Sequence, residues 1–186
     1  MSLKKIMPYR QGGLDRLCGV YGVINGVRLA FQHERSLSQE DYQCLFNTII
    51  DDLGQRELLT WVVRHGLGII TMCSILRTAD RWLFDHKNAR LVYHRPWARR
   101  ANNTDGQSVT EKLREHSALP YCSSIVWFGG KMNHWSVVKD INGKSISLFD
   151  SDGHKAVPIV QSAYNNQGSI PIIPQAVFLL TAVQIA

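Results

Sequence analysis

The sequence predicts an α+β fold, in which a helical first part is followed by an antiparallel sheet. Apolar residues at helical spacing dominate the chain up to about residue 118. After Pro120 the pattern changes to short apolar runs separated by turn residues, which is typical of hairpins. A chain of 186 residues can bury a core of its own. We therefore expect one domain, with a helical half at about 1–118 and a sheet half at about 119–186.

The first predicted helix is an apolar stretch at 20–31 that carries small residues at four-residue intervals. These residues would leave one nearly bare stripe along the helix, so that a neighbouring element can pack close to its backbone. Each glycine costs about 1 kcal/mol of helix propensity, which such packing has to offset. The small residues are Gly22, Gly26 and Ala30.

Two further helices are indicated by their ends. Ser38 is a typical N-cap, and it is followed by acidic residues and then by apolar residues at helical spacing. A third helix is expected at about 55–65, where Gly66 would end it. Residues 69–84 fit either one helix or a strand followed by a helix.

The middle of the chain is basic and less regular. Residues 85–106 are expected to form an irregular insertion around a short strand at 91–93. The run Ser-Val-Thr-Glu that begins at Ser108 is a capping box, which predicts a helix over 109–116. The strands of the sheet half are expected at 124–128, 134–139, 145–150 and 175–181.

Composition excludes several classes of protein. The four cysteines are far apart and form no Cys-x-x-Cys pair, so we expect neither a metal centre nor another cofactor, and no disulfide scaffold. The longest apolar run is only strand-sized, so no membrane span is expected. Residues 1–6 carry no secretory pattern, which favours the cytoplasm and leaves delivery to another compartment open. The formal net charge of +6 is compatible with an anionic partner.

The first candidate for chemistry is Cys18, which stands just before the helical stretch. The N–H groups and the dipole at a helix N-terminus favour a thiolate, the nucleophilic form of cysteine. Gly19 removes bulk where a substrate backbone would approach, and Gln11 offers a side-chain amide seven residues earlier. A lone cysteine is more often a small buried apolar residue, so this interpretation depends on its partners.

A thiolate enzyme needs an imidazole partner, a group that orients the imidazole, and donors for the oxyanion. His134 is the best imidazole candidate, because it opens a predicted strand directly after a turn that contains two glycines. Trp135 follows it in the chain and could shield one side of the site. A single histidine is more often structural, so the orienting group has to be found independently.

The register of the hairpin decides which carboxylate meets His134. A three-residue loop after Asp140 places His134 directly opposite Asp150, with Cβ atoms about 4.5–5.5 Å apart. A two-residue Asn-Gly turn shifts the pairing by one and puts Asp150 opposite Trp135, so that a bulge would be needed to recover it. Asp152 is the reserve for the orienting role.

The order Gln11, Cys18-Gly19, His134 and Asp150 resembles the papain-like cysteine peptidase superfamily. It is similar in particular to small bacterial peptidases that cleave double-glycine leader peptides. The resemblance implies a nucleophile helix packed against a C-terminal antiparallel sheet, with the site in the cleft between the two halves. The matching stretches are 11–19, 134–138 and 148–150.

The resemblance also implies a mechanism without a cofactor. Cys18 would attack a peptide, isopeptide or glutamine carboxamide and form a thioester, with His134 as proton-transfer partner and Asp150 as orienting group. Gln11 and the Cys18 N–H would stabilise the oxyanion. Asp15, three residues before the cysteine, is similar to the pattern of ovarian-tumour-type deubiquitinases. Isopeptidase, deamidase and acyltransferase activities therefore stay open beside hydrolysis of a peptide.

The basic segment at 90–100 suggests a rival function. Its positive charges alternate with aromatic residues, as in proteins that bind single-stranded nucleic acid. A non-catalytic module that binds peptide or nucleic acid is thus an alternative, while a solvated basic loop is the plainer interpretation. We expect a peptide or protein substrate rather than nucleic acid, with Arg95, Arg99 and Arg100 selecting acidic segments of it.

Overall fold

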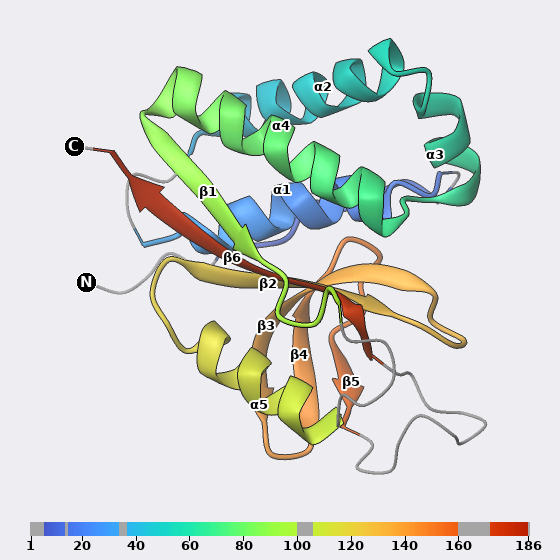
Figure 1. Cartoon of the computed structure of the whole chain (residues 1–186), viewed down its shortest axis with the longest axis vertical. Coiled ribbons are helices and arrows are strands. Elements are labelled where there is room, and N and C mark those ends of the chain that lie inside the picture. The colour runs from blue at the N-terminus through green and yellow to red at the C-terminus, as the bar shows by residue number, and fades with distance from the viewer. Residues whose placement is uncertain (1–5, 14, 34–36, 100–105, 160–171, 186) are drawn as a thin grey trace.

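The computed structural model describes residues 6–13, 15–33, 37–99, 106–159 and 172–185, and it has an α+β architecture (Figure 1). The helices are α1 (Cys18–Ala30), α2 (Gln39–Gln55), α3 (Leu59–His65), α4 (Ile69–Lys87) and α5 (Gly106–Ser117). The strands are β1 (Ala89–His94), β2 (Cys122–Phe128), β3 (His134–Asn142), β4 (Ser145–Phe149), β5 (Ala156–Pro158) and β6 (Ile172–Gln184).

The described strands form one sheet in the order β1-β6-β2-β3-β4-β5, and each neighbouring pair in it is antiparallel. The predicted antiparallel sheet is therefore confirmed. β1 pairs with β6 although it precedes residue 118 in the chain. The predicted division into a helical and a sheet half is accordingly a division of the sequence, whereas in space β1 belongs to the sheet.

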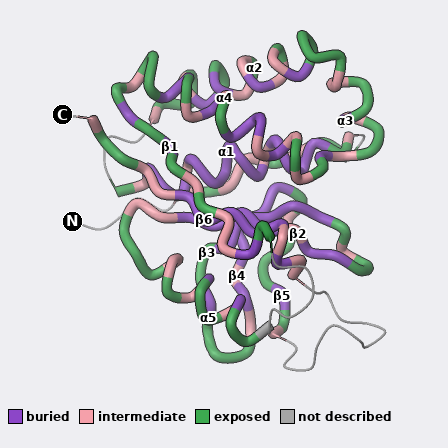
Figure 2. Tube along the Cα trace, in the orientation of Figure 1, coloured by how far each residue is buried: buried purple, intermediate pink, exposed green. Residues whose placement is uncertain are grey.

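Helices cover both faces of the sheet. The first four helices lie on one side, where α1 contacts the sheet directly, and α5 lies on the other side (Figure 1). Each interface has its own cluster of buried apolar side chains. The buried residues follow the sheet and the helix faces turned toward it, while the outer helix faces are exposed (Figure 2).

Several elements differ from the expected ones in extent. Residues 69–87 form one helix, so the β-branched residues at its start do not make a separate strand. Helix α5 begins at Gly106, which puts Ser108 inside the first turn rather than at the N-cap. Ser38 does cap α2, and a reciprocal capping box with Asp41 is formed. The short strand β5 was not expected from the sequence.

The small residues of α1 allow close packing against the sheet, as their spacing predicts. A Cβ atom at Gly26 would lie 2.9 Å from Leu180 Cδ1 and 3.3 Å from Ile125, so a side chain here would require these neighbours to shift. Ser123 Oγ on β2 donates a 2.8 Å hydrogen bond to the Gly26 carbonyl. The expectation for Gly19 is wrong, because the space that its missing side chain leaves is filled by Leu67 rather than left open to a substrate.

Candidate active site

Cys18 is the first residue of α1, and the preceding segment is held in place by hydrogen bonds from its backbone N–H groups. The Asp15 carboxylate accepts a 2.9 Å hydrogen bond from the Leu17 N–H. The Arg16 N–H donates to the Val63 carbonyl of α3 at 3.1 Å. Cys18 is 9% exposed, so its side chain lies at the edge of the core. The positive end of the α1 dipole therefore faces the region of the sulfur.

His134 is the first residue of β3, at the end of the turn that connects it to β2. Gly130 and Asn133 in this turn have positive φ angles of 61° and 41°. Such angles are easy for glycine and tolerated by asparagine, so these two residues allow the tight reversal. His134 then pairs with Phe128 on β2, and it is only 6% exposed.

The β3–β4 hairpin has a register that differs from both expected alternatives. Asn142 pairs with Ser145, so the turn consists of the two residues between them. The register shifts between Asp140 and Val138, which leaves Lys139 as an extra residue in β3. Beyond this bulge Val138 pairs with Leu148. The bulge changes by one which β4 residue each β3 residue faces.

The bulge brings His134 and Asp150 together. His134 Nε2 lies 2.7 Å from Asp150 Oδ2 in a buried hydrogen bond. The other oxygen, Asp150 Oδ1, accepts hydrogen bonds from the N–H groups of Asp152 at 2.8 Å and His154 at 3.1 Å. The carboxylate is thus held at both oxygens. The Asp152 carboxylate lies 3.6 Å from His154 Nε2 and is half-exposed, so the structure assigns the contact with His134 to Asp150.

The charged forms of His134 and Asp150 stabilise each other. Burial disfavours the charged form of His134, but hydrogen bonds and charge interactions with Asp150 and Cys18 raise its pKa to about 10. Burial also disfavours the Asp150 carboxylate, but the hydrogen bond from His134 holds the pKa of Asp150 at about 2. The imidazole is therefore protonated at neutral pH. Its Nε2–H donates to Asp150. The Cys18 side chain is close enough to the imidazole to contribute to the raised pKa of His134, and its sulfur also lies 4.0 Å from the Arg16 carbonyl oxygen.

Gln11 contacts Ser151, the residue that follows Asp150. Its N–H donates to the Ser151 carbonyl at 3.1 Å, and its side-chain Oε1 accepts a 3.3 Å hydrogen bond from Ser151 Oγ. Ser151 directly follows Asp150 and is 4% exposed. The structure therefore brings Gln11, which is distant in sequence from the hairpin, against the loop that carries the carboxylate.

Trp135 lies behind the site rather than at its mouth. Its side chain is buried, and its indole Nε1 donates a 2.9 Å hydrogen bond to the Leu67 carbonyl. Leu67 fills the space beside Gly19, the residue after Cys18. Trp127 meets the Trp135 ring edge to face, with centroids 5.0 Å apart. Trp135 therefore supports the wall against which the start of α1 packs.

His154 is a residue near the site that the sequence did not indicate. Its ring lies 5.6 Å from the His134 ring in a T-shaped arrangement, and its N–H reaches Asp150. Ser151 was missed in the same way. Both residues lie within four positions of Asp150, and this nearness in sequence is the signal that could have pointed to them.

The basic segment is held by the rest of the fold. Arg90 makes a bidentate ion pair with Asp80. Arg95 donates a 2.6 Å hydrogen bond from Nη2 to the Gln175 carbonyl. Two of its aromatic rings are not available as a stacking surface, since Trp97 is 5% exposed and the half-buried ring of Tyr93 packs on Phe178 with centroids 5.9 Å apart. Arg99 is exposed, and Arg100 lies outside the described residues.

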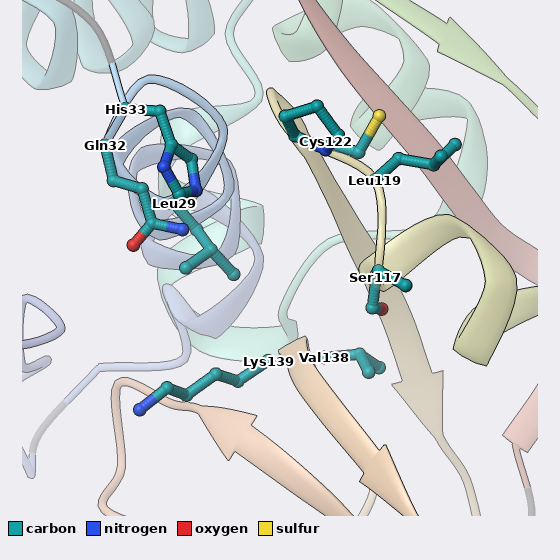
Figure 3. A pocket seen from close by; sticks show the side chains of 10 residues that line it. Leu29, Gln32, His33, Ser117, Leu119, Cys122, Val138 and Lys139 are labelled. Atoms are coloured by element: carbon teal, nitrogen blue, oxygen red, sulfur yellow. The ribbon is translucent and has the colours of Figure 1, made fainter. Parts of the chain in front are cut away.

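A pocket of about 210 Å³ lies elsewhere, at the C-terminal end of α1 (Figure 3). Figure 3 shows Leu29, Gln32 and His33 on one side of it and Ser117, Leu119 and Cys122 on another. Cys18 stands at the opposite end of the same helix. The pocket is thus separate from the cluster around His134.

In the part of the chain that the structure describes, no three His, Cys, Asp or Glu side chains gather as metal ligands would. The described helices also include none with the length and apolar character needed to cross a membrane. Comparison with protein-family models, with curated proteins and with solved structures found no match to this chain.

Proposed function

We propose that this protein is a cysteine peptidase-like thiol hydrolase with Cys18 as nucleophile, His134 as acid and base, and Asp150 as orienting group. The observation that carries the proposal is the buried 2.7 Å hydrogen bond between His134 Nε2 and Asp150 Oδ2, with the Cys18 side chain close enough to the imidazole to contribute to its raised pKa. The three groups come from the start of a helix, the start of a strand and the loop directly after the neighbouring strand, and all three are buried. This is the arrangement that nucleophilic catalysis by a thiolate requires.

The proposed reaction is an acyl transfer through a thioester. The Cys18 thiolate attacks the carbonyl carbon of the substrate, and the new C–S bond pushes an electron pair onto the carbonyl oxygen. The Cys18 N–H and the Gln11 carboxamide donate to this oxyanion. As the C–N bond breaks, His134 gives its Nδ1 proton to the leaving amine. Water then attacks the thioester, returns a proton to His134, and releases the acid and the thiolate.

The architecture supports a papain-like fold for this site. Helix α1, which begins at the proposed nucleophile, packs against β2 and β3 of an antiparallel sheet. His134 on β3 and Asp150 directly after β4 follow Cys18 in the chain order that the resemblance requires. The ovarian-tumour-type isopeptidase, the deamidase and the acyltransferase use the same groups, so this arrangement supports each of them equally.

The proposed substrate is a peptide or protein, and an acidic segment of it would meet the basic surface. Arg99 is the described residue of the basic segment that can test this idea, because it is exposed while Arg95 is held by the Gln175 carbonyl. Replacing Arg99 by alanine should raise the KM of an acidic peptide and leave that of a neutral peptide unchanged. If Arg99→Ala leaves the KM of both peptides unchanged, the basic segment plays no part in selecting the substrate. The burial of Trp97 makes a stacking platform for nucleic acid the weaker alternative.

The activity can be tested without knowing the substrate. A pool of peptides and proteins is incubated with the native protein, with Cys18→Ala and with Cys44→Ala, and is then analysed by mass spectrometry. Cys44 is an exposed cysteine on α2 and serves as the matched control. We expect the same products from the native protein and Cys44→Ala, and none from Cys18→Ala. Cleavage, deamidation and amine transfer give different mass changes, whereas identical pools in all three samples would refute the proposed function.

A further inference from the structure

The N-terminal segment 6–13, here called the strap, is fixed to α1 by one buried side chain. Asn25 lies in the middle of α1 and is 1% exposed. Its Oδ1 accepts a 2.8 Å hydrogen bond from the Tyr9 N–H, and its Nδ2 donates to the Tyr9 carbonyl at 3.0 Å. A buried carboxamide is costly unless it is hydrogen-bonded, and here both of its ends bind one residue of the strap. Asn25 therefore fixes the strap on the proposed nucleophile helix.

The strap is fixed at a second place, on the loop that follows β4. Gln11 binds Ser151 through its backbone and through its side chain. The neighbouring Arg10 guanidinium occupies the place that a Cβ atom at Gly153 would take, so a side chain at this position would have to displace it. Gly153 also has a φ angle of 95°, which few other residues adopt. The backbone of this loop is thus shaped to lie under the strap.

The strap consequently joins the two parts of the site that come from distant regions of the sequence. Asn25 and Cys18 are on the same helix, seven residues apart, while Ser151 directly follows Asp150. The Ser151 hydroxyl binds the oxygen of the Gln11 carboxamide. This contact leaves the NH₂ group as the end of the side chain that can donate to an oxyanion.

We propose that Ser151 and Asn25 are positioning residues, which hold the Gln11 carboxamide in the orientation that stabilises the oxyanion. This inference rests on the proposed function. Ser151 acts on the side chain of Gln11 directly, and Asn25 acts through the backbone of the strap. Neither residue touches the reacting atoms. Replacing either residue should therefore lower kcat by disturbing Gln11, and it should leave the Cys18 and His134 side chains in place.

A double-mutant cycle tests the role of Ser151. Gln11→Ala removes a proposed oxyanion donor and should lower kcat by about 100-fold. Ser151→Ala should lower kcat by about tenfold with little change in KM, and Ser151→Thr, which keeps a hydroxyl, should recover most of the loss. The decisive variant combines Gln11→Ala with Ser151→Ala, and we expect it to be no slower than Gln11→Ala alone.

The matched control for this cycle is Ser145→Ala at the other end of β4. Ser145 Oγ also makes a side-chain hydrogen bond, at 2.8 Å to Asn142 Oδ1, but its partner belongs to the β3–β4 hairpin and not to the strap. We expect its kcat to equal that of the native protein. Losses that multiply in the double variant, or a native kcat in Ser151→Ala, would overturn the role assigned to Ser151.

Hydrogen exchange tests the strap independently of catalysis. The N–H groups of Tyr9 and Gln11 should exchange slowly in the native protein, because both are hydrogen-bonded. Asn25→Leu should raise both exchange rates by at least tenfold, whereas amides in the sheet keep their protection. Unchanged exchange at Gln11 would overturn the role of Asn25. A native protein that shows this exchange pattern but cleaves nothing would refute the proposed function and leave the strap as a purely structural clamp.

Discussion

His134 Nε2 is 2.7 Å from Asp150 Oδ2, although the two residues are not directly opposite each other in the hairpin. Beyond the bulge, Val137 pairs with Phe149, so continuing the register would place Ser136 opposite Asp150. His134 then stands two positions farther along on the same side of the strand. Diagonal neighbours of this kind are within reach of long side chains, and an imidazole and a carboxylate span the distance.

Asp150→Asn removes the negative charge of this side chain and keeps its shape. Asparagine keeps an oxygen for the N–H groups of Asp152 and His154, so the loop is expected to fold normally. Loss of the negative charge removes a main cause of the raised pKa of His134, which should fall from about 10 toward its usual value of 6.5. Histidine NMR titration measures this shift. We expect kcat to fall by about 10²–10⁴-fold, the size of a general acid–base contribution.

The matched control is Asp152→Asn, the same substitution two residues away on a half-exposed side chain. We expect its kcat to stay within about threefold of the native value and the pKa of His134 to remain high. A large loss in Asp152→Asn with little effect of Asp150→Asn would transfer the orienting role to Asp152.

The pH dependence of stability follows from the same pair. The pKa of His134 is raised on folding, so its stabilising contribution is complete below pH 6.5 and is lost as the pH rises through about 10. The pKa of Asp150 is lowered, so its contribution is present above pH 3.8 and is lost as the pH falls through about 2. Urea unfolding should therefore show a greater loss of free energy between pH 7 and pH 10.5 in the native protein than in His134→Gln. Parallel curves for the two proteins would contradict the raised pKa.

Much of the site could be predicted because it depends on local features of the sequence. Cys18 precedes a helical pattern, His134 opens an apolar run after a glycine turn, and both assignments need only neighbouring residues. The pairing of β3 with β4 could not be predicted. The extra residue Lys139 has no distinctive chemistry, and β3 packs on both faces of the sheet, so no local pattern marks the position of the bulge.

What the sequence left open or missed in the fold also has physical causes. Two isoleucines at the start of α4 favour a strand locally, but α4 packs along α2 and β1, and these tertiary contacts determine its conformation. Strand β5 has only three residues, which is too short for a period to be recognised. Leu67 packs on Gly19 although the two residues are 48 positions apart in the sequence, so no local sequence pattern could predict this contact.

Gly19→Ala is expected to destabilise the protein, because the new Cβ would overlap Leu67. Leu67 cannot withdraw freely, since its carbonyl accepts the indole hydrogen bond of Trp135. Overpacking of this kind costs about 1–3 kcal/mol, measurable by urea unfolding. Gly54→Ala is the matched control, because Gly54 lies within α2 and has open space around its Cβ position. There alanine should raise stability by up to about 1 kcal/mol. The same loss at both positions would argue against specific packing at Gly19.

The two basic residues Arg95 and Arg99 should behave differently when each is replaced by alanine. Arg95 binds the Gln175 carbonyl and lies over the Phe178 ring at 5.1 Å, so its loss should cost about 1–2 kcal/mol. Arg99 is exposed, and its replacement should change stability by less than about 0.5 kcal/mol. Thermal and urea unfolding measure both. An equal effect of the two substitutions would mean that the segment is held less firmly than these contacts indicate.

Alkylation of Cys18 tests the proposed pairing of its sulfur with His134 directly. Because the pKa of His134 is about 10, the imidazolium is present at pH 6, and the proposed mechanism requires it to activate the Cys18 sulfur toward iodoacetamide. The exposed Cys44 is an internal reference in the same molecule. We expect Cys18 to be labelled at least tenfold faster than Cys44 at pH 6, even though Cys18 is only 9% exposed. His134→Gln should remove this advantage and leave the labelling of Cys44 unchanged. If Cys18 reacts no faster than Cys44, or keeps its rate without the imidazole, the sulfur is an inert buried thiol and the proposed mechanism is wrong.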